Sequence, residues 1–126
     1  MANVRLDQNG IPKGEVFEST APLLHRSGIT EVDGSDPADA SGAVDTAGYR
    51  YCRFDITLSG SGLASLEVQV LFWNARLGQW FGGAKRYLTE TGRHSIQAET
   101  RGEMVFLKVT SFSGTSFNLS ADYALS

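Results

Sequence analysis

The feature that most constrains this chain is a repeated alternation of apolar and polar residues, which runs from residue 49 to the C-terminus in short stretches interrupted by glycine. A period of two places successive side chains on opposite faces of a strand, so each stretch predicts a strand with one buried face. No helix is needed to explain the pattern. Short strands punctuated by glycine are typical of an antiparallel sandwich or barrel rather than of βαβ units.

The last stretch has the clearest alternation, and it predicts five core residues. Ser59–Gly62 is a flexible turn, so we expect the strands on either side of it, 49–58 and 66–73, to pair as a hairpin. Glycines 82 and 83 inside the third strand predict a bulge or a close backbone approach. The strands are expected at 49–58, 66–73, 79–88, around residue 96, at 103–112 and at 117–125, and the core residues of the last are Phe117, Leu119, Ala121, Tyr123 and Leu125.

The first 48 residues have a weaker pattern. Residues 1–22 are polar and contain Gly10, Pro12, Gly14 and Pro22, which predicts an extended arm that orders against another surface. Leu24 and Ile29 are candidate core residues of a strand over 23–32, the segment 33–41 has the composition of a loop, and 43–45 opens another strand. The fold class is therefore all-β: an antiparallel, jelly-roll-like sandwich of seven to eight strands at 23–126.

Size and charge narrow the class of protein. A chain of 126 residues is expected to form one domain, and no apolar run approaches the ~20 residues of a membrane helix, so we expect it to be soluble. No apolar segment in the first twenty residues resembles a signal peptide, which favours synthesis in the cytoplasm. Residues 1–48 have a net charge of −5 and residues 49–126 one of +2. This balance argues against binding to nucleic acid.

No local motif indicates catalysis. The serine-glycine pairs fit turns better than a nucleophile elbow, and the glycine-rich turn lacks the lysine of a phosphate loop. The two histidines, His25 and His94, have no metal-ligand spacing and are expected on the surface or in loops. Cys52 lies on the inward phase of its strand, which predicts a buried, inert thiol. We therefore expect a protein that is not an enzyme and has no cofactor.

The acidic loop provides the only candidate metal ligands. Asp33, Asp36 and Asp39 are spaced three residues apart, and calcium takes several oxygen ligands from such loops. The spacing differs from that of an EF-hand, which needs ligands at alternate positions and a terminal glutamate. A solvated acidic loop is therefore the favoured interpretation, with the three aspartates as weak calcium candidates.

The aromatic residues offer a second kind of candidate site. Trp73 falls on the opposite phase from Val68, Val70 and Phe72, and Tyr51 falls opposite Cys52, so these rings are candidates for exposure. Exposed aromatic rings anchor protein interfaces and stack on sugars. Three interpretations of Trp73 stay open: a plug at the end of the core, a protein-interface anchor, or a platform for a glycan.

The overall arrangement resembles a known family. A polar arm, the segment Ser41-Gly-Ala-Val-Asp-Thr-Ala-Gly-Tyr49 and strands that end in Val109-Thr-Ser-Phe-Ser-Gly-Thr-Ser-Phe-Asn-Leu119 are similar to small jelly-roll virion proteins of tailed bacteriophages. The resemblance is closest to head decoration, or cementing, proteins. It implies binding to an assembled capsid lattice, a homo-oligomer with a trimer expected, an arm that reaches a neighbouring subunit, and no catalytic residues.

The sequence thus predicts a non-enzymatic virion structural protein that stabilises a capsid through protein contacts. The candidate interface residues are Arg5, Leu6 and Phe17 in the arm, together with Trp73. The alternative is a carbohydrate-binding or adhesin-like sandwich in which Trp73, Trp80 or Tyr87 stacks on sugars, assisted by calcium in the acidic loop. Neither membrane nor nucleic acid is an expected partner.

Overall fold

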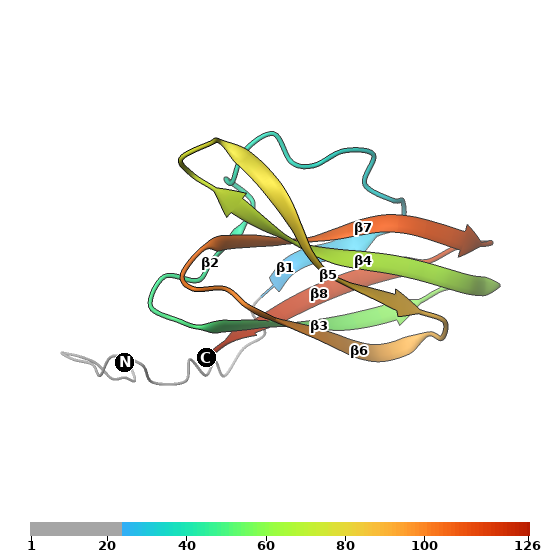
Figure 1. The fold of residues 1–126 in the computed structure, drawn as a ribbon. Helices are drawn as coiled ribbons and strands as arrows, with labels where there is room; N and C mark the ends of the chain where they lie inside the picture. The colour runs from blue at the N-terminus through green and yellow to red at the C-terminus, as the bar shows by residue number, and fades with distance from the viewer. Residues whose placement is uncertain (1–23) are drawn as a thin grey trace.

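The computed structural model describes residues 24–126, which fold into two antiparallel four-stranded sheets packed face to face (Figure 1). The predicted arm, residues 1–22, and residue 23 lie outside the described residues. The strands are β1 (Leu24–Ile29), β2 (Val44–Asp45), β3 (Tyr51–Ser59), β4 (Leu63–Asn74), β5 (Gln79–Leu88), β6 (Gly92–Glu99), β7 (Met104–Gly114) and β8 (Asn118–Leu125).

The strand order identifies the sandwich as a jelly roll. One sheet has the order β1-β8-β3-β6 and the other β2-β7-β4-β5, so strands from the two halves of the chain interleave in each sheet. This is the double Greek-key arrangement of jelly rolls. The predicted fold class is confirmed, with eight strands. Within residues 24–126 there is no helix long and apolar enough to cross a membrane.

One predicted pairing is wrong. β3 pairs with β6 and β8 while β4 pairs with β5 and β7, so these consecutive strands lie in different sheets and form no hairpin. The connection between them, Gly60–Gly62, crosses from one sheet to the other. Gly60 has a φ of +138°, and a Cβ there would lie 2.4 Å from the Ser116 carbonyl oxygen. Glycine is required at this position because the last turn of the chain packs against it.

The core lies between the sheets and follows the predicted alternation. Cys52 is fully buried, as expected, and Ile29 and Tyr123 pack against the core from partly buried positions. The expectation for Leu24 is wrong: its side chain is 58% exposed, because β1 begins at the open edge of its sheet. The buried core residues shared by β3, β4, β7 and β8 are Cys52, Phe54, Ile56, Leu58, Leu66, Val68, Val70, Val105, Leu107, Val109, Leu119, Ala121 and Leu125.

The glycine pair in β5 forms the predicted bulge. Gln69 pairs with Lys85 and Leu71 with Gly82, so Val70 of β4 faces two residues of β5, Gly83 and Ala84. A Cβ on Gly83 would lie 2.2 Å from the Phe72 ring. The absence of a side chain therefore allows Phe72 to approach the β5 backbone, and the bulge bends the edge strand of this sheet.

Candidate functional site

Among residues 24–126, the short length of β2 leaves most of the β7 edge without a neighbouring strand. β2 pairs only with Met104 and Val105, and the following backbone groups of β7 need other partners. Leu107 N–H donates to His25 Nε2 at 3.0 Å, and Val109 N–H donates to Asp33 Oδ2 at 2.8 Å. Residues from β1 and from the β1–β2 loop (residues 30–43) thus satisfy the β7 edge.

His25 is a structural residue of this edge, and the expectation of a surface or loop position is wrong. Its ring lies 5.2 Å from the Phe54 ring and 4.9 Å from the Phe106 ring, between the two sheets. Burial, reinforced by the charge of Arg26 and opposed by that of Asp33, lowers its pKa from 6.5 to about 4. A neutral imidazole fits its role, since Nε2 must accept the Leu107 N–H.

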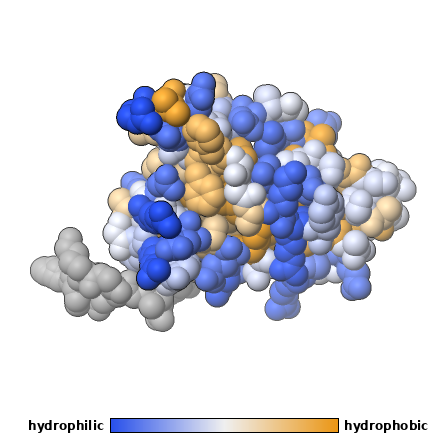
Figure 2. All heavy atoms as spheres, in the orientation of Figure 1, coloured by the Kyte–Doolittle hydropathy of each residue, from blue (hydrophilic) through white to orange (hydrophobic). Residues whose placement is uncertain are grey.

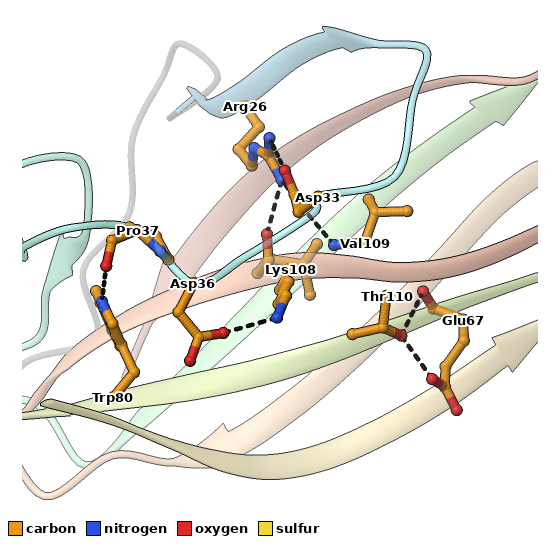
Figure 3. Close-up of polar contacts among 10 residues, drawn as sticks. Arg26, Asp33, Asp36, Pro37, Glu67, Trp80, Lys108, Val109 and Thr110 are labelled. Atoms are coloured by element: carbon orange, nitrogen blue, oxygen red, sulfur yellow. Dashed lines mark hydrogen bonds and ion pairs between the residues drawn. The ribbon is translucent and has the colours of Figure 1, made fainter.

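Arg26 and Asp33 form a largely buried ion pair that ties the start of the loop to the sandwich (Figure 3). Two guanidinium nitrogens donate to the two carboxylate oxygens at 2.6 and 2.9 Å, and one also reaches the Leu107 carbonyl. The guanidinium lies 4.9 Å from the centre of the Phe106 ring. Such bidentate pairs are among the stronger polar contacts in proteins. The loop is therefore fixed where it leaves β1.

The three candidate calcium ligands do not converge. Asp33 binds Arg26, and Asp36 accepts from Lys108 Nζ at 2.7 Å (Figure 3). Asp39 accepts from the Ser41 N–H at 2.9 Å. No group of three or more histidine, cysteine or acidic residues within residues 24–126 is arranged to hold a metal ion. The negative charge of the loop instead pairs partly with the strands beneath it.

Trp73 and Trp80 support the same loop from below. They face each other across β4 and β5, with ring centres 5.1 Å apart in an edge-on arrangement. Trp80 Nε1 donates to the Pro37 carbonyl at 2.9 Å (Figure 3). The Trp80 ring centre lies 6.0 Å from that of Phe106. Both rings are partly buried. Trp73 therefore packs against Trp80, and the Trp80 side chain bonds to the loop. The other interface candidates, Arg5, Leu6 and Phe17, lie outside the described residues.

The β4–β5 hairpin exposes most of the large apolar side chains left uncovered among residues 24–126. Of five such residues, three belong to it: Leu77 at its turn, 47% exposed, and Phe81 and Tyr87 on β5, 47% and 67% exposed. Figure 2 shows a hydrophobic band down the middle of this side, below the hairpin, with hydrophilic residues on both sides. We call Leu77, Phe81, Tyr87 and the neighbouring exposed cations Arg76, Lys85 and Arg86 the hairpin patch. It includes both faces of the edge strand: Phe81 and Arg86 pair with inward residues of β4, whereas Tyr87 and Lys85 pair with outward ones.

Sequence reasoning did not single out the hairpin patch as an interface, because the period of two is silent about which strand forms a sheet edge. β5 pairs only with β4 among the described residues. Phe81 falls on the inward phase opposite Phe72, but at this edge nothing in the described part of the chain covers it fully. Three exposed cations within a span of eleven residues, next to the aromatic residues, were the available signal.

A shallow polar depression lies across β3, β6 and β8 and is also lined by Arg86 of the hairpin patch. Asp55 and Asp122 are directly opposite each other on neighbouring strands, and Arg53 binds Asp55 at 2.8 Å. Arg86 of β5 reaches over to the Ser95 carbonyl of β6 and helps to close the open edge between the sheets. The depression has a volume of about 500 Å³, and its remaining wall residues are Ile56, Thr57, Arg93 and His94.

The architecture defines the class as a jelly-roll β-sandwich. No family model matches the chain, and no curated protein matches it. One solved structure, a crystal structure of SPBc2 prophage-derived protein YomS, aligns over 89% of this chain and 90% of its own, with 16% identity and a TM-score of 0.39. A likeness at this TM-score carries no argument about fold or function.

Proposed function

We propose that this chain is a non-enzymatic virion accessory protein, of the capsid-decoration kind, that binds an assembled lattice through protein contacts. The observation behind this proposal is the hairpin patch, where three large apolar side chains are exposed beside three cations. Apolar and aromatic side chains gathered at an edge with polar surroundings are typical of protein-binding surfaces. The resemblance of the sequence to phage virion proteins supplies the class of partner.

The rest of the described surface supports a rigid building block. The Arg26–Asp33 pair, the Asp36–Lys108 pair and the Trp80–Pro37 bond fix the β1–β2 loop to the sandwich. A surface ordered before binding loses less conformational entropy when it binds, which favours repeated contacts along a lattice. The hairpin patch therefore stands on a rigid sandwich, which needs little rearrangement when a partner binds.

The test is localisation on purified particles. Phage particles from cells that encode the chain would be banded by density, analysed by mass spectrometry and labelled with an antibody for electron microscopy. Label on heads supports decoration. Label on tails alone would contradict the decoration role but would still support a role for the protein in the virion. If mass spectrometry detects the other particle proteins but not this chain, the proposal is overturned.

A variant pair tests the surface itself. Phe81→Ser with Tyr87→Ser removes two exposed rings of the hairpin patch, while Leu24→Ser removes an exposed side chain from β1 in the other sheet. We expect the first variant to bind stripped particles at least about tenfold more weakly, since aromatic anchors dominate such interfaces, and the second to bind normally. Equal binding by all three proteins would contradict the role of the patch.

The glycan-binding alternative now depends on Tyr87. Trp73 and Trp80 pack against each other, and the aspartates of the acidic loop bind protein groups. The Tyr87 ring is 67% exposed and stands on β5, where a sugar ring could stack on it. A glycan array probed with the wild type and Tyr87→Ala tests this alternative, which requires a signal that the variant loses.

A further inference from the structure

One segment of the fold lies along the β7 edge without forming a regular part of either sheet: β1 together with the β1–β2 loop, residues 24–43. We call this segment the strap. Among the described residues, β1 pairs only with β8, at three residue pairs interrupted by two register shifts, and the loop contributes no strand. Asp36 and Pro37 join the middle of the loop to Lys108 and Trp80 (Figure 3). The strap therefore depends on side-chain contacts for much of its attachment, unlike the central strands.

The strap is attached to the β7 backbone at two neighbouring points. At Leu107, His25 Nε2 accepts from the N–H at 3.0 Å and Arg26 donates to the carbonyl at 3.2 Å. At Val109, the Asp33 carboxylate accepts from the N–H and the Asp33 N–H donates to the carbonyl, both at 2.8 Å. Arg26 and Asp33 also bind each other, so the two points are linked. These contacts take the place of the hydrogen bonds that a neighbouring strand would make.

The contact made by His25 cannot survive protonation of the ring. An imidazolium carries a proton on both nitrogens, so Nε2 would become a second donor facing the Leu107 N–H. Two donors cannot share a hydrogen bond, and the protonated ring has to leave the β7 edge. Arg26 follows His25 directly in the chain and binds Asp33, so movement of the ring disturbs both points of attachment.

The surroundings of the His25 ring also disfavour a positive charge. Phe54 of β3 and Phe106 of β7 pack against it, with ring centres 5.2 and 4.9 Å away, and neither is titratable. Among the described residues, the charged groups that act on the ring are Arg26, which repels a proton, and Asp33, which attracts one. The Asp33 carboxylate is already bound by Arg26 at 2.6 and 2.9 Å. The protonated ring is therefore more stable in water than in this site.

We propose that the strap is a pH-sensitive switch: uptake of a proton by His25 releases residues 24–43 from the β7 edge while the rest of the sandwich stays folded. The strap contains none of the buried core residues, and only Ile29 packs against the core, from a partly buried position. Its release therefore leaves the core between the sheets intact. The backbone groups of Leu107 and Val109 then become open to pairing with another strand, as at any uncovered sheet edge.

The experiment is amide hydrogen exchange of the full chain, followed by nuclear magnetic resonance at pH 7 and pH 5 and at several urea concentrations below the unfolding transition. Rates are corrected for the intrinsic pH dependence of exchange. The amides of Leu107 and Val109 report on the strap, and those of Phe54 and Ile56 report on the sandwich, because β3 is paired on both sides. Release of the strap exposes little surface, so its opening should depend weakly on urea, whereas unfolding of the sandwich depends strongly on it.

An imidazole pKa of 6.5 in the released strap and of about 4 in the attached one predicts that opening at Leu107 and Val109 becomes about twentyfold more frequent between pH 7 and pH 5. The same opening free energy and urea dependence at these amides as in β3 would overturn the proposal, because the strap would then open only when the whole sandwich unfolds.

A pair of histidine variants assigns the pH response. His25→Gln keeps an acceptor for the Leu107 N–H but takes up no proton, so it should lose the twentyfold change. His94→Gln removes the other histidine, which bonds to the Glu90 carbonyl, and should keep the change. Melting temperatures establish that both variants fold. A response that persists in His25→Gln would also overturn the proposal. The assay contains no particles, so its outcome is independent of the capsid-binding test.

Discussion

The buried position of His25 predicts a specific dependence of stability on pH. The unfolded chain has an imidazole pKa near 6.5, whereas burial and Arg26 lower the folded value to about 4. Between these values the unfolded state binds a proton that the folded state excludes, so the free energy of unfolding rises with pH in this window. His25 thus leaves stability undiminished above pH 6.5 and reduces it progressively from pH 6.5 to 4.

The size of the effect follows from the two pKa values. One pKa unit corresponds to about 1.4 kcal/mol, so a change from 6.5 to about 4 corresponds to about 3 kcal/mol of unfolding free energy lost by pH 4. Protonation would also remove the acceptor of the Leu107 N–H and place a cation beside Arg26. The loss is a large part of the stability of a domain of this size.

Urea unfolding of the wild type and of His25→Gln between pH 7.5 and 4 measures the effect. Glutamine accepts the Leu107 N–H through its side-chain oxygen but takes up no proton. Acidic groups with lowered pKa values, such as Glu67, contribute equally to both proteins, so the difference between the two curves isolates His25. Parallel curves, or a nuclear magnetic resonance titration of His25 with a midpoint near 6.5, would refute the reasoning.

Three further substitutions test the contacts that hold the loop and the bulge. Asp33→Ala removes the partner of Arg26 and the acceptor of the Val109 N–H, and we expect a loss of about 2–3 kcal/mol in urea unfolding. Gly83→Ala drives a Cβ into the Phe72 ring and is expected to cost about 1–3 kcal/mol, measured in the same way. Trp80→Phe removes the bond to the Pro37 carbonyl, so amide hydrogens of the loop should exchange faster, with about 1 kcal/mol lost.

Matched controls distinguish these effects from general damage. Asp39→Ala changes an exposed aspartate of the same loop that has no cation partner within residues 24–126, and it should change stability much less than Asp33→Ala. Gly34→Ala places a Cβ where no atom of the described chain, apart from the adjacent residues, lies within 4 Å, and it should be nearly neutral. Equal losses for either matched pair would contradict the contact assignments.

The alternation of apolar and polar residues was sufficient to predict the strands, because each sheet buries one face. The inward residues of β3 and β8 and the bulge at Gly83 follow from local rules and are confirmed. Strand pairing did not follow in the same way. The Ser59–Gly62 turn reads as a hairpin in sequence, yet it crosses between sheets, because pairing depends on contacts far apart along the chain.

In the candidate site, too, local sequence identified some residues but did not predict the distant contacts that define their roles. The sequence marked Asp33, Asp36 and Trp73 as noteworthy, but their roles depend on Arg26, Lys108 and Trp80, residues up to 72 positions away. His25 was expected on the surface or in a loop because it has no metal-ligand spacing to His94 or to further cysteines. Its burial results from the short β2, which leaves the β7 backbone to be satisfied by side chains. No local sequence pattern indicates that a strand of the other sheet has an edge without a pairing strand.

The most direct test of the central claim is a cryo-electron microscopy map of the particle with this protein bound. The account predicts density for the jelly roll on the lattice, with the β4–β5 hairpin buried against a neighbouring protein and Phe81 and Tyr87 in the interface. A map in which the sandwich is bound through another face, with the hairpin patch open to solvent, would contradict the account.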